Sequence, residues 1–349
     1  ADNMRRIYPL AVTLPLILLL LIANTINIAA DIAAMADAME LVGAGTRHIY
    51  AVVFGMGCLL LQIFIPYERY VRILKWLTLS LFAYVGTVFA VDVPWHKVIV
   101  GTLLPHLKTQ SDYVLLVVGI FGTTISPYLF FWQAGQEVED KRARNARAHL
   151  SDAPENAAKH LKRIKWDTAI GMGFSNLIAF FIMLTTAVTL YPAGIHDIQT
   201  SAQAAEALRP IAGEFAFAMF AAGIIGTGLL AVPVLAGSAA YAVAELMRKP
   251  ASLSLKPAAA KDFYAIIAIA TMLGVILDFT SIDPIKALLR SAVINGIVAV
   301  PLMATLMHMG AQPSLMGRFV IGQRMKIMGW LATAVMTVAV LTLSIISLI

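Results

Sequence analysis

The hydrophobic pattern divides the chain into nine long apolar segments separated by short polar ones. Each segment is long enough to cross roughly 30 Å of hydrocarbon at about 20 residues per helix. None alternates apolar and polar residues as a transmembrane β-strand does. The pattern predicts an all-α polytopic membrane protein with a single domain over 1–349 and spans at 8–42, 47–66, 71–92, 113–137, 166–192, 213–246, 262–281, 284–309 and 323–349.

Composition supports a membrane protein and argues against several other classes. Hydrophobic residues make up 60% of the chain and charged residues 13%, with a mean hydropathy of +0.81, whereas soluble domains carry about 25% charged residues. The net charge of +6 is therefore attributed to cytoplasmic loops, and no nucleic-acid partner is expected. No phosphate-binding, zinc or nucleophile motif occurs, so we expect neither an enzyme nor a cofactor.

The positive charges are distributed unevenly between the loops. With nine spans, one side of the membrane receives the N-terminal segment and the loops near 67–75, 138–165, 247–261 and 310–326, which hold 20 of the 26 Lys and Arg residues. Positive residues concentrate in cytoplasmic loops. We therefore expect a protein of the cell inner (plasma) membrane with a cytoplasmic N-terminus, a cytoplasmic loop 138–165 and an extracytoplasmic C-terminus.

The fourth span contains a sequence that disfavours a continuous helix. Proline removes a backbone donor and clashes with the carbonyl one turn earlier, and unwound backbone at membrane depth must line a cavity or be buried in protein. Thr123 and Ser126 are the candidate oxygen ligands, and we expect the Thr123 carbonyl to be unpaired. A simple proline kink is the alternative. The expected break involves Gly122, Thr123, Thr124, Ser126, Pro127 and Tyr128.

The first span carries a polar stripe. Asn24, Asn27 and Asp31 fall on one helical face. An ionisable residue inside a span is costly unless it is paired or hydrated. We expect Asn24 to form an interhelical hydrogen bond and Asn27 and Asp31 to form a functional polar network. Asn295, in a later span, is a further candidate metal contact through its amide oxygen.

These stretches together resemble the NRAMP (natural resistance-associated macrophage protein) family of divalent metal transporters. The segment with Asn27, Ala30, Asp31 and Met35 resembles the family's third helix, and residues 122–128 resemble its unwound sixth helix. The resemblance implies an inverted-repeat (LeuT-type) transporter fold, in which the nine predicted helices match helices three to eleven. It also implies that the family's first two helices are missing from this sequence, so we expect an N-terminally truncated chain.

The sequence departs from the family pattern where the metal and the protons are handled. Ser126 stands where the family usually has a methionine, Tyr128 replaces a histidine, and Ala34 replaces a second acid. Hydroxyl and carbonyl oxygens suit Mg²⁺ and Mn²⁺ better than a thioether does. The sequence is therefore similar to the magnesium-type branch of the family.

The resulting functional prediction is transport of divalent cations, with Mg²⁺ and Mn²⁺ favoured, by a secondary transporter or facilitator in the lipid bilayer. Two alternatives remain open. A sodium-coupled organic-solute (amino-acid) symporter would share the fold, and a non-transporting membrane scaffold would share the hydrophobic pattern. Asp278 is expected at the membrane interface and His48 in solvent.

Overall fold

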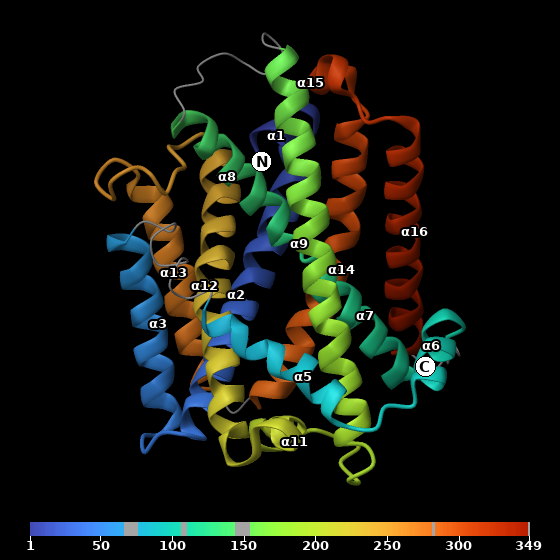
Figure 1. Cartoon of the computed structure of the whole chain (residues 1–349). Coiled ribbons are helices and arrows are strands. Elements are labelled where there is room, and N and C mark those ends of the chain that lie inside the picture. The colour runs from blue at the N-terminus through green and yellow to red at the C-terminus, as the bar shows by residue number, and fades with distance from the viewer. Residues whose placement is uncertain (66–75, 106–109, 144–153, 281–282, 348–349) are drawn as a thin grey trace.

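A computed structural model describes the chain except for residues 66–75, 106–109, 144–153, 281–282 and 348–349, and except for the side chains of 77–78, 141–143 and 154–159. The described residues are helical apart from loops and turns (Figure 1). The longer helices are α2 (Leu10–Glu40), α3 (Arg47–Phe64), α7 (Ser111–Ile125), α8 (Tyr128–Ala143), α9 (Pro154–Thr189), α12 (Ala216–Leu246), α13 (Lys261–Asp278), α14 (Pro284–Gly310) and α16 (Gln323–Ile346). Shorter helices are α1 (Asp2–Ile7), η1 (Leu77–Leu81), α5 (Phe82–Ala90), α6 (Trp95–Leu103), α10 (Ser201–Ala205), η2 (Glu206–Leu208), α11 (Arg209–Ala212), η3 (Gly213–Phe215), α15 (Pro313–Met316) and η4 (Gly317–Phe319).

Helix α2 lies at the centre of the bundle and packs against α3, α12, α13 and α14. Its side chains Ile28 and Met35 are completely buried. Glycines on the neighbouring helices make this packing close: a Cβ at Gly274 would collide with Ile28, and one at Gly228 would collide with Met35. Small residues let helix backbones approach each other in a membrane, so these glycines fix α12 and α13 against α2.

Helix α14 connects α2 to a second group of helices, α7 and α16. It begins with a helix cap in which the Asp283 side chain accepts hydrogen bonds from the amides of Ile285 and Lys286. Its contact with α7 is made through facing glycines. A Cβ at Gly122 would collide with the backbone of Ala292 and Gly296, so α7 and α14 pack backbone to backbone at this level.

Seven stretches of the described residues are long and apolar enough to cross a membrane: Leu10–Glu40, Arg47–Phe64, Ser111–Asp140, His160–Thr189, Ser201–Leu246, Pro284–Gly310 and Gln323–Ile346. The chain is therefore an all-helical, multi-pass membrane protein. The other two predicted spans, 71–92 and 262–281, correspond in part to η1 with α5 and to α13. Part of 71–92 lies outside the described residues, so the count of nine stays a prediction.

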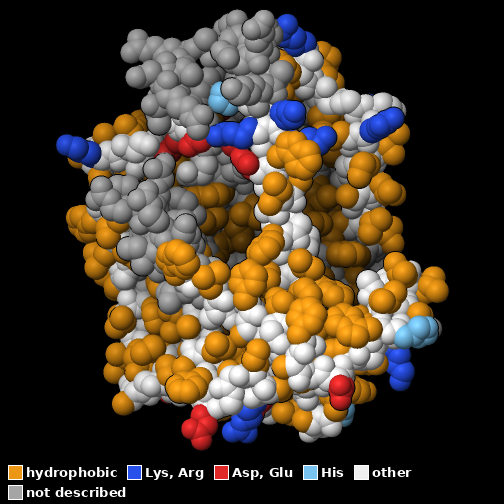
Figure 2. Space-filling view, viewed as in Figure 1, with side chains coloured by type: hydrophobic (Ala, Val, Ile, Leu, Met, Phe, Trp, Pro, Cys, Tyr) orange, Lys and Arg blue, Asp and Glu red, His pale blue; other side chains and the backbone are white. Residues whose placement is uncertain are grey.

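The two ends of the bundle differ in charge. Lys and Arg side chains gather at the end that carries α1 and α15, and hydrophobic side chains cover much of the surface between the ends (Figure 2). The predicted loop 138–165 belongs to this basic end. Its first residues continue α8 to Ala143 and its last residues belong to α9, which starts at Pro154. Residues 144–153 lie outside the described part of the chain.

Candidate functional site

The predicted helix break lies between α7 and α8. Helix α7 ends at Ile125 and α8 starts at Tyr128, so Ser126 and Pro127 belong to neither helix. Ser126 adopts a left-handed backbone conformation, with φ of 40° and ψ of 84°, which costs energy for any residue other than glycine. Gly122 and Thr124, which were also assigned to the break, lie inside the last turns of α7.

The Thr123 carbonyl is paired, contrary to the sequence-based expectation. Pro127 has no N–H to donate to it. The Ser126 hydroxyl takes that place and donates to the Thr123 oxygen at 2.5 Å, while the Ser126 amide donates to the Gly122 carbonyl at 3.1 Å. The expectation failed because the serine side chain substitutes for the amide that proline lacks.

The hydroxyl groups around the break are also bonded to the backbone. Thr123 and Thr124 both donate to the Ile120 carbonyl, at 2.9 and 2.8 Å. Thr123 is exposed, Thr124 is half-buried and Ser126 is buried. A hydroxyl that donates its proton keeps lone pairs as an acceptor. The break therefore offers three hydroxyl oxygens that retain lone pairs.

The polar stripe of α2 contacts two neighbouring helices. Asn24 donates to the Leu235 carbonyl at 2.9 Å and to the Ser238 hydroxyl at 2.7 Å, both on α12. This confirms the predicted interhelical hydrogen bond. Asn27 faces α14 instead: its amide nitrogen donates to Asn295 Oδ1 at 2.8 Å, and Asn295 donates back to Asn27 Oδ1 at 3.0 Å. The stripe therefore lies along the seam between α12 and α14.

The Asp31 carboxylate lies one turn beyond Asn27 and is half-buried. Within the described part of the chain it makes no hydrogen bond or ion pair. It is close enough to Tyr128, the first residue of α8, to interact with it electrostatically. An unpaired carboxylate inside a membrane span is costly unless it is hydrated, protonated or bound to a cation, so Asp31 is the candidate to attract a cation near the break.

Helix packing places Asn295, the remaining candidate metal contact, near the break. Asn295 precedes Gly296, whose amide lies against Gly122, and Ser126 follows Gly122 by one helical turn. In this conformation Asn295 is buried and its amide is engaged with Asn27. Its oxygen retains one lone pair, so a role as a metal contact stays a prediction.

The ligand chemistry of this region is that of hard oxygen donors. In the part of the chain that the structure describes, no group of three or more His, Cys, Asp or Glu side chains is arranged to hold a metal. Cys58 is buried and unbonded to another cysteine. Hydroxyl, carbonyl and amide oxygens with one nearby carboxylate suit Mg²⁺, Ca²⁺ or Mn²⁺ rather than soft metals.

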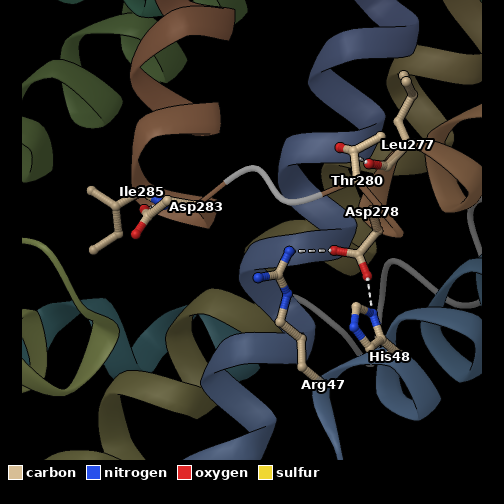
Figure 3. A network of polar contacts seen from close by, with 7 residues as sticks. All are labelled: Arg47, His48, Leu277, Asp278, Thr280, Asp283 and Ile285. Atoms are coloured by element: carbon tan, nitrogen blue, oxygen red, sulfur yellow. Dashed lines mark hydrogen bonds and ion pairs between the residues drawn. The ribbon is translucent and has the colours of Figure 1, made fainter.

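A second polar network, which sequence reasoning missed, joins the start of α3 to the end of α13 (Figure 3), at the opposite end of the bundle from α1 (Figure 1). Asp278 is the last residue of α13 and is only 3% exposed; its place at the membrane interface stays a prediction. Its Oδ1 accepts from Arg47 at 2.8 Å, and His48 Nδ1 lies 3.5 Å from its Oδ2. His48 also stacks on Phe279, so it is a partner of Asp278 and not a purely solvated residue. The partners lie 231 residues apart in sequence, and no local pattern indicates the pairing.

Three known proteins with similar sequences share one name. A "Divalent metal cation transporter MntH" of Caldanaerobacter subterraneus subsp. tengcongensis is 26% identical over 214 residues, which cover 61% of this chain and 46% of that protein. Proteins with the same name from Erwinia tasmaniensis and Pectobacterium carotovorum are 25% and 27% identical over 215 and 129 residues, covering 57% and 37% of this chain. The matches span 49% and 28% of those two relatives, so this chain corresponds to about half or less of each protein.

The family comparison covers nearly the whole chain. Residues 1–346 match the family described as "Natural resistance-associated macrophage protein-like". The match includes the polar stripe of α2, the break between α7 and α8, and Asn295. The chain therefore belongs to the Nramp family.

Proposed function

We propose that this protein transports divalent metal cations across a membrane. The observation that carries the proposal is the break at Ser126 and Pro127 in a stretch long enough to span the bilayer, with the unpaired Asp31 carboxylate nearby. Broken helices at membrane depth build ion sites in many secondary transporters. The relatives carry the name of a divalent metal cation transporter and not of an enzyme, which supports the same class of activity.

The proposed ions are Mg²⁺ and Mn²⁺. Ser126 and Thr123 would contribute oxygen ligands, Asn295 a further contact, and Asp31 a charge that acts through water. Mg²⁺ dehydrates reluctantly and usually keeps several waters in an octahedral shell. A serine at position 126 is smaller than the methionine that the family usually has there, which supports assignment to a magnesium-type branch of the family.

Family membership implies the LeuT-type inverted-repeat fold, and we assign the nine predicted spans to it. The basic end of the bundle faces the cytoplasm in this proposal, because positive residues mark the cytoplasmic side. The loop 138–165 is then cytoplasmic, the C-terminus is extracytoplasmic, and the protein resides in the inner (plasma) membrane.

The test is uptake into proteoliposomes that contain the purified full-length protein and a dye sensitive to Mg²⁺ or to Mn²⁺, with protein-free liposomes as the control. We expect saturable Mg²⁺ entry that Asp31→Asn slows strongly, because the neutral amide no longer attracts the cation. Absence of Mg²⁺ and Mn²⁺ entry from a correctly folded preparation would contradict the proposal.

A further inference from the structure

The start of α16 carries positive charge that no acid in this part of the sequence offsets. Arg324 and Lys326 lie in the first turn of α16, and Arg318 lies in η4 just before it; all three are exposed. No Asp or Glu occurs from residue 284 to residue 349. Within the part of the chain that the structure describes, Arg324 and Lys326 form no ion pair or hydrogen bond. These two residues, called the basic corner below, are therefore available to a further partner.

Several other cations at the same end of the bundle already have a carboxylate partner. The pairs are Arg6 with Asp2 at 2.7 Å, Arg163 with Glu137 at 2.7 Å and Lys249 with Asp262 at 3.4 Å. A carboxylate at that distance offsets much of the charge that the cation presents to a third group. The charge of the basic corner is not offset in this way, so an anion at the start of α16 meets unneutralised cations.

The basic corner lies at the boundary between hydrocarbon and headgroups. The stretch Gln323–Ile346 is long and apolar enough to cross a membrane. It has no charged residue beyond Lys326, and the remaining length of about 20 residues crosses roughly 30 Å of hydrocarbon. Trp330, one turn beyond Lys326, is 42% exposed, and tryptophan is enriched at membrane–water interfaces. Arg324 and Lys326 therefore lie at the level of the lipid headgroups.

An exposed apolar stripe runs along α16 from the basic corner. It continues the helical face of Arg324, and its members are Met328, Leu331, Val335 and Val338, which are 49–71% exposed. The opposite face packs against α7 and α14, and its buried residues are Thr333, Met336 and Leu343. From Met328 to Val338 the stripe is about 15 Å long at 1.5 Å per residue, which is half of the hydrocarbon thickness. The stripe therefore has the length of one lipid leaflet.

We propose that this face of α16 binds an anionic phospholipid of the leaflet at the basic end. The headgroup phosphate pairs with Arg324 and Lys326, and an acyl chain lies along the stripe from Met328 to Val338. Charge selects the lipid, because each Lys or Arg near an anionic membrane surface raises affinity about fivefold. A zwitterionic lipid carries a cation beside its phosphate and is attracted less.

The first test is native mass spectrometry of the purified full-length protein in detergent, titrated with phosphatidylglycerol or phosphatidylcholine. Arg324→Gln/Lys326→Gln should weaken binding of phosphatidylglycerol about tenfold and leave phosphatidylcholine unchanged. Lys249→Gln/Lys256→Gln is the matched control, because it removes the same net charge from exposed residues of the same end, and it should bind as the wild type does. Equal losses in the two variants, or equal binding of the two lipids by the wild type, would overturn the proposal.

The second test locates the lipid on α16. A fluorophore on Leu331→Cys, in a Cys58→Ala background in nanodiscs, reports contact with lipids that carry bromine on their acyl chains. At equal mole fraction, brominated phosphatidylglycerol should quench it at least about twofold more strongly than brominated phosphatidylcholine. Arg324→Gln/Lys326→Gln should abolish that preference.

The control position is Ile269→Cys on α13. Ile269 is 58% exposed, against 63% for Leu331, and it lies as far from the start of its helix as Leu331 does. It should show no preference between the two brominated lipids. The same quenching by both lipids at Leu331, or the finding that a second copy of the chain covers this face, would overturn the proposal. Neither test involves ion transport, so the lipid site is tested separately from the proposed function.

Discussion

Asn27 of α2 and Asn295 of α14 exchange two amide hydrogen bonds, at 2.8 and 3.0 Å. Both side chains are buried. A buried amide that loses its partner has no water to replace it, so this pair fixes α14 against α2 beside the break. It also orients the amide that is proposed to approach the metal.

Replacing Asn27 by alanine should destabilise the protein by about 1–3 kcal/mol, because Asn295 would remain buried without its partner. The double variant Asn27→Ala/Asn295→Ala should lose little more stability than either single variant. Thermal unfolding in detergent measures these differences in stability. Thr25→Ala is the control, since among the described residues the Thr25 hydroxyl bonds only to the Leu21 carbonyl of its own helix. Strict additivity of the two alanine substitutions would show that the pair does not act as a unit.

The contact between α7 and α14 predicts a sharp difference between two glycines. A Cβ at Gly122 would collide with the backbone of Ala292, whereas a Cβ at Gly119 would meet side chains at 3.5–3.9 Å, an ordinary contact distance. Gly122→Ala should therefore cost about 1–3 kcal/mol through overpacking. Gly119→Ala should be close to neutral or stabilising, as glycine is a poor helix former. Similar melting temperatures for the two variants would contradict the described packing.

Breaking the buried ion pair between Arg47 and Asp278 should greatly lower the free energy of unfolding. Arg47→Leu leaves a carboxylate buried without its cation, which costs about 3–5 kcal/mol in soluble proteins. The double variant Arg47→Leu/Asp278→Leu should recover much of that loss, since it leaves no charge behind. Arg209→Leu is the control, because Arg209 forms an exposed pair with Glu206, and such pairs contribute about 0–1 kcal/mol. Unfolding midpoints that rank Arg209→Leu as the more damaging change would refute this assignment.

The sequence was sufficient to predict the helical class and the position of the break. Both depend on local features, namely the apolar runs, Pro127 and the small residues before it. It was insufficient for contacts between distant segments. The ion pair of Asp278 was not predicted, because nothing near it in sequence indicates Arg47. The Thr123 carbonyl was expected to be free because a rotamer of Ser126, which no pattern specifies, decides whether the carbonyl is capped.

The orientation in the membrane can be measured by cysteine labelling in intact cells, in a Cys58→Ala background. Ala44 and Ser314 are both exposed, and they lie in the α2–α3 loop and in α15, at opposite ends of the bundle (Figure 1). An impermeant maleimide should label Ala44→Cys and not Ser314→Cys, because the basic end is expected to face the cytoplasm. The reverse pattern would invert the proposed topology.

The effect of Ser126 on the ion preference of transport tests the proposed site most directly. A thioether favours soft metals and a hydroxyl favours hard ones, so Ser126→Met should shift uptake from Mg²⁺ toward Mn²⁺ and Cd²⁺. Thr186→Met, a change at a hydroxyl that bonds within α9, is the control and should not alter ion preference. The measurement is dye-reported uptake of each ion into proteoliposomes, with a pH dye in parallel. We predict Mg²⁺ uptake with little accompanying proton flux for the wild type. Mn²⁺ uptake with stoichiometric proton flux, no Mg²⁺ uptake, and no effect of Ser126→Met would contradict an oxygen-lined site at this break.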